Sequence, residues 1–179
     1  LLHMALRIEL LPRTMWKAAL PLGVMLSAEM DLIPVTTVGL AAVWIFSIAW
    51  WALSMTGAWY YDKPIGHTLT KYNNAVTGIV GLVLIFAAFS SAAGNGPFVA
   101  DASWLHWKVG IYGAINLMIV AMLYVFDPMG IEFGKLAVEG STPETETTIK
   151  TIMDRATVTI WLTYIMILIV GFIATTKII

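Results

Sequence analysis

The sequence contains no cysteine and only three histidines among its 179 residues. Without cysteine the chain can form no disulfide, no thiolate nucleophile, no iron–sulfur cluster and no cysteine-ligated zinc site. Charged residues are also scarce, at 12% of the chain against about 25% in an average soluble domain. They form no basic cluster of the kind that binds nucleic acid. What remains is a chain that is 59% apolar, for which the lipid bilayer is the expected environment.

Four stretches of the sequence contain no charged residue, and each is long enough to cross a hydrocarbon core of about 30 Å as a helix. A bilayer offers no partner for free backbone groups, and the alternating pattern of barrel strands is missing, so these stretches are expected to be helices. The sequence predicts an all-α, integral membrane four-helix bundle over residues 32–179. The predicted spans are residues 32–60, 74–92, 104–126 and 156–176.

Residues 1–31 mix apolar residues with charges, and their apolar run at 18–28 is too short to span a bilayer. An interfacial N-terminal segment is the first interpretation. The alternative is a re-entrant hairpin kinked at Pro21, because proline interrupts the hydrogen bonds of a helix interior. The charged residues of this segment include Arg7, Glu9, Arg13 and Lys17.

The connections are expected to be loops. Lys63-Pro64 marks a turn in residues 61–73, and Asn73 or Asn74 is expected to cap the second span. Residues 127–155 form a polar loop large enough to fold outside the bilayer. Within it, the run from Ser141 to Glu144 has a helix-start pattern, and that helix is expected to continue into the fourth span.

The third span is the most polar of the four. Lys108, Tyr112 and Asn116 are four residues apart, so they share one stripe of a helix and can point together into a bundle. With His106 they form the candidate cofactor-binding site, and haem or another tetrapyrrole is the cofactor considered. The alternative is that Lys108 snorkels to the headgroups and His106 sets the depth of its helix.

Small and aromatic residues suggest where the helices pack and where the bilayer ends. Small residues allow close helix approach, and tryptophan and tyrosine gather at membrane interfaces. The predicted packing residues are Gly78, Gly81, Gly110, Gly113 and Ala114, and the predicted interfacial anchors are Trp59, Tyr60, Tyr61, Trp104 and Trp107.

No catalytic constellation is recognisable. The sequence has no nucleotide-binding loop, no hydrolase triad and no paired carboxylates for acid–base work, so catalytic residues stay unknown. No metal site is predicted. Met118 and Met122 are spaced like a thioether pair for Cu(I), but adaptable core or lipid contacts are the preferred interpretation.

The residues Trp104-Leu105-His106-Trp107-Lys108, followed later by Arg155, an apolar span and Lys177, resemble a family of small four-helix bacterial membrane proteins. That family includes the HemJ-type protoporphyrinogen oxidases, the CopD-like copper-resistance domains and the DUF2269 proteins. The resemblance implies a four-helix fold. For the HemJ type it also implies a bound haem and porphyrinogen oxidation through a first-helix histidine and a third-helix lysine. Lys108 matches that lysine, whereas residues 32–60 contain no histidine.

Two functional hypotheses follow. The first is a noncatalytic integral-membrane subunit of the bacterial inner membrane that packs against other integral membrane proteins in a larger complex. The alternative is a HemJ-like tetrapyrrole-binding redox protein. Copper or small-solute transport is a weaker alternative that rests on the methionine pair alone.

Overall fold

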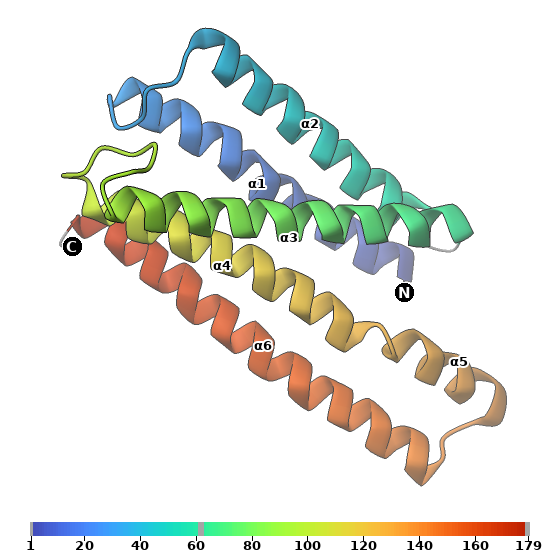
Figure 1. The fold of residues 1–179 in the computed structure, drawn as a ribbon. Helices are drawn as coiled ribbons and strands as arrows, with labels where there is room; N and C mark the ends of the chain where they lie inside the picture. The colour runs from blue at the N-terminus through green and yellow to red at the C-terminus, as the bar shows by residue number, and fades with distance from the viewer. Residues whose placement is uncertain (1, 61–62, 178–179) are drawn as a thin grey trace. The chain divides into compact units, whose positions relative to one another are not determined.

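The structure is a computed structural model that describes residues 2–60 and 63–177, with side chains described from residue 10 onward. This part of the chain is helical and contains no strand (Figure 1). Four segments are long and apolar enough to cross a membrane, so the all-α class and the multi-pass integral membrane class are confirmed. The helices are α1 (Leu2–Glu29), α2 (Thr37–Trp59), α3 (Pro64–Ala92), α4 (Ser103–Phe126), α5 (Met129–Glu139) and α6 (Pro143–Thr176).

The chain divides into two compact units. The first contains Leu1–Ile79 and Phe89–Ala102, and the second contains Val80–Ala88 and Ser103–Ile179. Helix α3 therefore contributes its two ends to the first unit and its segment Val80–Ala88 to the second.

In the first unit α1 and α2 lie side by side and antiparallel (Figure 1). Helix α1 is one continuous helix that contains Pro12 and Pro21, so the structure does not form a hairpin turned at Pro21. Helix α1 is not among the four helices that are long and apolar enough to span a membrane.

Helix α2 begins at Thr37 instead of near residue 32, because Thr36 is its N-cap. The Thr36 side chain accepts a hydrogen bond from the Gly39 amide at 3.1 Å, which satisfies one of the amides that a helix start leaves open. The buried face of α2 repeats at intervals of three and four residues, as one stripe of a helix must. That face consists of Ser47, Trp50, Ser54 and Gly57.

Helix α3 corrects two predictions. Residues 64–73 are helical and not part of a loop, because Pro64 occupies the first turn, where its fixed φ favours a helix start. Lys63 is extended, as expected before proline, and serves as the N-cap. Asn73 and Asn74 lie inside α3 and do not cap it. The sequence located only the apolar part of this helix, because hydropathy does not reveal a helix that continues beyond its apolar run.

In the second unit α4 and α6 run antiparallel, and α5 lies beside the first part of α6 (Figure 1). Helix α4 agrees with the predicted span to within one residue. Helix α6 begins at Pro143, as predicted: the Thr142 side chain accepts from the Thr145 amide at 3.2 Å, and Glu144 and Glu146 stand in the first turn.

Residues 127–155 were predicted as a polar loop with a helix beginning at its end; that helix is present, but the helix α5 (Met129–Glu139) was not predicted, which corrects the loop assignment. They contain α5 and the first 13 residues of α6, joined by a short turn at Gly140, whose φ of 78° suits glycine. We call α5 together with residues 143–155 the acidic arm. Its interior contains Met129, Glu132, Thr145 and Ile152.

Candidate functional site

The first unit contains a buried lysine between α1 and α2. Lys17 is 5% exposed, and its Nζ lies 3.8 Å from the ring centroid of Trp50 on α2. Among the side chains that the structure describes, this cation–π contact is the only stabilising interaction of the Lys17 amine, and none of their carboxylates lies within ion-pair distance of it. Helix α2 carries no charged residue from Thr37 to Trp59. An amine in this setting lacks the counterion that a buried charge requires.

A cavity of about 110 Å³ adjoins Lys17. Ser47 lines it and is 4% exposed, and its Oγ has no hydrogen-bond partner among the described residues. On the same wall Trp51 Nε1 donates to Thr14 Oγ1 at 3.0 Å, which ties the two helices together. The remaining lining is apolar and comes from Ala18, Pro21, Trp44 and Ile48.

The environment of Lys17 favours its neutral form. Burial lowers the pKa of the Lys17 ammonium from 10.5 to about 7, and the positive charge of Arg13, one turn earlier on α1, acts in the same direction. Because the pKa lies close to neutral pH, a modest change in the surroundings would change the charge of this group.

The site lies well inside the length of α2. Trp50 is nine residues from Trp59, which is about 13 Å along a helix. A buried ionisable group without a counterion is costly, so Lys17 is the strongest candidate site residue of the first unit.

The structure brings together part of the predicted stripe on α4. Asn116 is fully buried, and its Nδ2 donates to the Tyr112 carbonyl at 2.9 Å. Lys108 and Tyr112 are half-buried on the same helix. Because Asn116 faces Gly81 of α3, this end of the stripe is occupied by helix packing.

The two histidines described with side chains occupy different environments. His106 is 7% exposed near the start of α4, whereas His67 is exposed and lies in α3 instead of the predicted loop. Within residues 10–60 and 63–177, no three histidine, aspartate or glutamate side chains gather to hold a metal ion. Met118 and Met122 are half-buried in α4.

Several predicted packing glycines lie at close helix contacts in the second unit. A methyl group on Gly81 would lie 2.8 Å from the Gly113 carbonyl oxygen, and one on Gly110 would lie 3.3 Å from Ala88 Cβ. These distances mean that the backbones of α3 and α4 approach where side chains are smallest. Gly78 differs, because nothing lies within 4 Å of its Cβ position. Ala114 is half-buried on α4.

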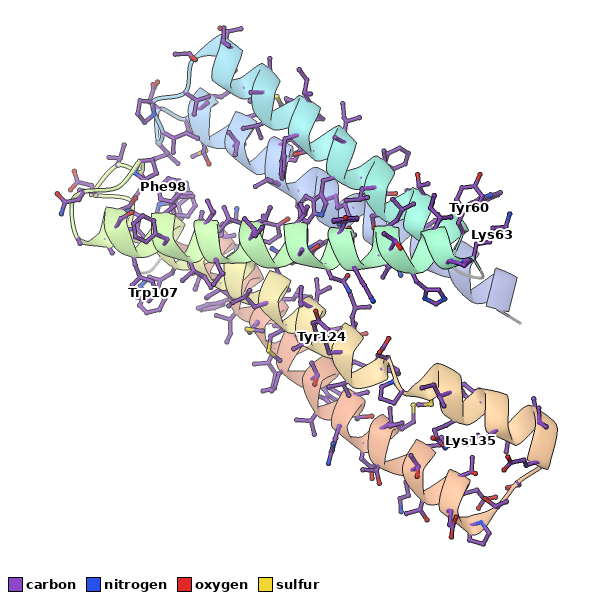
Figure 2. The ribbon with its side chains drawn as sticks, turned by 45° about the vertical axis from the view of Figure 1, so that its right-hand side comes forward. Tyr60, Lys63, Phe98, Trp107, Tyr124 and Lys135 are labelled. Carbon is purple, nitrogen blue, oxygen red and sulfur yellow. The ribbon has the colours of Figure 1, made fainter. Side chains whose placement is uncertain are left out.

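The predicted interfacial aromatics occupy helix ends. Trp59 and Tyr60 are exposed at the end of α2, and the Lys63 amine lies 5.1 Å from the Tyr60 ring centroid (Figure 2). Trp107 is exposed near the start of α4 (Figure 2). The Trp104 ring lies 5.3 Å from Lys177 Nζ, so the start of α4 and the end of α6 lie side by side at the same end of the second unit. Tyr61 lies outside the described residues.

Sequence reasoning did not single out Lys17 and Ser47 as site residues. A signal was present, because Ser47, Ser54 and Gly57 interrupt an apolar span at the spacing of one helical face. That pattern indicates the packing face of α2, but it does not reveal which helix covers it.

No protein-family model, no curated protein and no solved structure matches the chain. The fold itself therefore defines the class of protein, which is an all-helical, multi-pass integral membrane protein.

Proposed function

We propose that the chain is a noncatalytic integral-membrane subunit that docks onto a partner membrane protein through its acidic arm. The observation that carries this proposal is a set of large apolar side chains exposed on α5. Ile131 is 66% exposed, Phe133 is 55% exposed and Val138 is 86% exposed.

The length of α6 supports a position of the arm outside the bilayer. This helix has 34 residues and is therefore about 51 Å long, which exceeds a hydrocarbon core of about 30 Å. If Lys177 lies at one interface beside Trp104, the core ends near residue 157, and residues 143–155 project beyond it. Exposed apolar groups on a projecting segment indicate a surface that another molecule covers.

The charge of the arm indicates which molecule covers it. The arm contains five acids and three bases, a net charge of −2. Anionic lipid headgroups would repel this segment, because they attract basic segments and not acidic ones. A basic protein surface with apolar patches complements both features, so the proposed occupant is a water-exposed segment of a partner membrane protein.

The spanning helices agree with such a role. Between 11% and 28% of their most apolar windows is buried within the chain, so much of each helix surface is left to lipid or to neighbouring helices.

A photo-crosslinking experiment tests this proposal. A photoreactive amino acid replaces Val138 on the arm, and in a matched control it replaces Phe86, which is 75% exposed in the α3 span. We expect a discrete protein adduct from position 138, loss of that adduct when Glu144 and Glu146 are changed to lysine, and predominantly lipid adducts from position 86. A monodisperse monomer after extraction in mild detergent, without an adduct at position 138, would refute the subunit role.

The second candidate function is HemJ-like tetrapyrrole handling, favoured by the burial of His106 two residues before Lys108. The resemblance of Trp104–Lys108 to bacterial proteins also supports placing the chain in the bacterial inner membrane.

An absorption spectrum of the gently extracted, sized chain tests the HemJ-like candidate function. A Soret band that stays with the chain and disappears in Lys108→Ala, but not in His67→Ala, would support it. A colourless chain would reject it.

A further inference from the structure

We propose that the cavity between α1 and α2 holds one acyl chain of a bilayer lipid, which packs between the two helices as a structural lipid. The cavity lies wholly within the first unit, so this site is independent of the acidic arm.

The surface that faces the cavity is apolar, although Thr14, Lys17 and Ser47 are among the residues that line it. The Lys17 amine is directed onto the Trp50 ring, 3.8 Å from its centroid, so Lys17 offers its methylenes to the cavity. The Thr14 hydroxyl accepts from Trp51 Nε1 at 3.0 Å, and the Ser47 hydroxyl is buried out of reach of a ligand. A ligand in this cavity would therefore meet only hydrocarbon and indole surface.

The size and the lining of the cavity favour an apolar occupant over water. A water molecule in a buried site needs two to four polar partners, and this surface offers none. Empty space would cost the lining atoms their dispersion contacts on one side. The volume is about 110 Å³, and an apolar cavity of about 150 Å³ binds benzene, so the space admits a short length of one aliphatic chain.

The position of the cavity favours a lipid as the source of that chain. Trp44, Ile48 and Trp51 come from the middle of α2, which is a candidate membrane span without a charged residue. Acyl chains are expected to surround such a span at this level. The rim of the cavity is open to them, because Ile48 is 58% exposed and Trp51 is 40% exposed. A lipid can therefore insert one acyl chain while its headgroup stays at the interface.

A bound acyl chain would help to hold α1 against α2. Ala18 of α1 and Trp44 of α2 line the cavity from its two sides, so the chain would contact both helices and extend the apolar interface between them. It would also cover the methylenes of Lys17 and keep water away from the buried amine.

Photolabelling by a lipid tests this proposal on the full chain in nanodiscs. The probe is a phosphatidylcholine that carries a diazirine in the middle of one acyl chain, and the labelled residues are mapped by mass spectrometry of peptides. The half-buried Trp44 reports on the cavity, and Phe86 of α3, which is 75% exposed, reports on ordinary lipid contact. We expect both residues to be labelled in nanodiscs. After transfer to detergent and washing, illumination should still label Trp44 and no longer label Phe86.

Ala18→Met provides a variant in which a longer side chain fills part of the cavity. Ala42→Met is its matched control, because Ala42 is exposed on α2 and does not line the cavity. An acyl chain could enter the filled cavity only by overpacking it, so labelling of Trp44 relative to Phe86 should fall about tenfold in Ala18→Met. The ratio should stay unchanged in Ala42→Met.

Two results would overturn the proposal. The first is loss of the Trp44 and Phe86 labels in parallel on washing, because the cavity would then hold no lipid of its own. This comparison uses the unchanged chain and does not require Ala18→Met to fold. The second is an equal effect of the two methionine variants on the labelling of Trp44, because the labelled chain would then lie outside the cavity.

Discussion

Gly81 of α3 and Gly113 of α4 meet backbone to backbone in the second unit. A Cβ added to Gly81 would lie 2.8 Å from the Gly113 carbonyl oxygen, and a Cβ added to Gly113 would lie 2.7 Å from the Gly81 carbonyl oxygen. Both distances are shorter than real Cβ contacts allow, so the contact requires glycine on both helices.

Gly113→Ala should therefore destabilise the protein. The methyl group must push α3 away, and overpacking of this kind costs about 1–3 kcal/mol. Gly78→Ala is the matched control, because its added methyl group meets nothing and alanine favours helix by about 1 kcal/mol over glycine. Thermal unfolding in detergent should show a lower midpoint for Gly113→Ala and an equal or higher one for Gly78→Ala. Equal midpoints for the two variants would contradict the close contact.

Lys17 should make stability depend on pH. Its folded-state pKa, about 7, lies below the ordinary value of 10.5, so between these limits the unfolded chain binds more protons than the folded protein. Stability should therefore rise with pH through this window and stay at its minimum below about pH 7, where both states are protonated. Melting in detergent from pH 6 to pH 10 measures the trend.

Lys17→Met should remove this pH-dependent contribution. Methionine keeps much of the side-chain length without the charge, so the variant should melt above the unchanged chain at pH 7, with each kcal/mol worth about 2–4 °C. The two melting curves should converge as pH approaches 10, where Lys17 is neutral. A constant difference between them would show that Lys17 does not titrate in this range.

Thr142→Ala should loosen the start of α6. The substitution removes the acceptor for the Thr145 amide at 3.2 Å, and loss of such a cap costs about 1 kcal/mol. Hydrogen exchange of the Thr145 amide should accelerate, while the amides of the α6 span stay protected. Thr148→Ala serves as the control, because the Thr148 hydroxyl only donates back to the Glu144 carbonyl on the exposed surface.

Gly96→Ala should displace the loop after α3. Its Cβ would overlap Ser91 Oγ, the atom that accepts a hydrogen bond from the Phe98 amide at 3.1 Å. The loop must move away from Ser91 to make room. Faster exchange of the Phe98 amide and faster proteolysis within residues 93–102 should follow. Unchanged exchange in the variant would show that the loop adapts without losing this bond.

Local chemistry explains which parts of the fold the sequence predicted well. The start of α6 depends on Thr142, Pro143 and the acids that follow, all within one turn, so it could be located from the sequence. The α4 span was also located, because hydropathy marks the part of a helix that lies in lipid. The start of α3 was missed because residues 64–73 are polar, and a helix can extend past its apolar run without a hydropathy signal.

The sequence by itself determined the class of protein, because the charge-free runs leave their backbone groups no partner in a bilayer except a helix. Only the tertiary structure decided which side chains became buried. Lys17 belongs to a charged segment by sequence, yet packing of α1 on α2 buries it against Trp50. Burial, cavities and glycine contacts depend on which helices meet and in what register, and that depends on residues far apart in the chain.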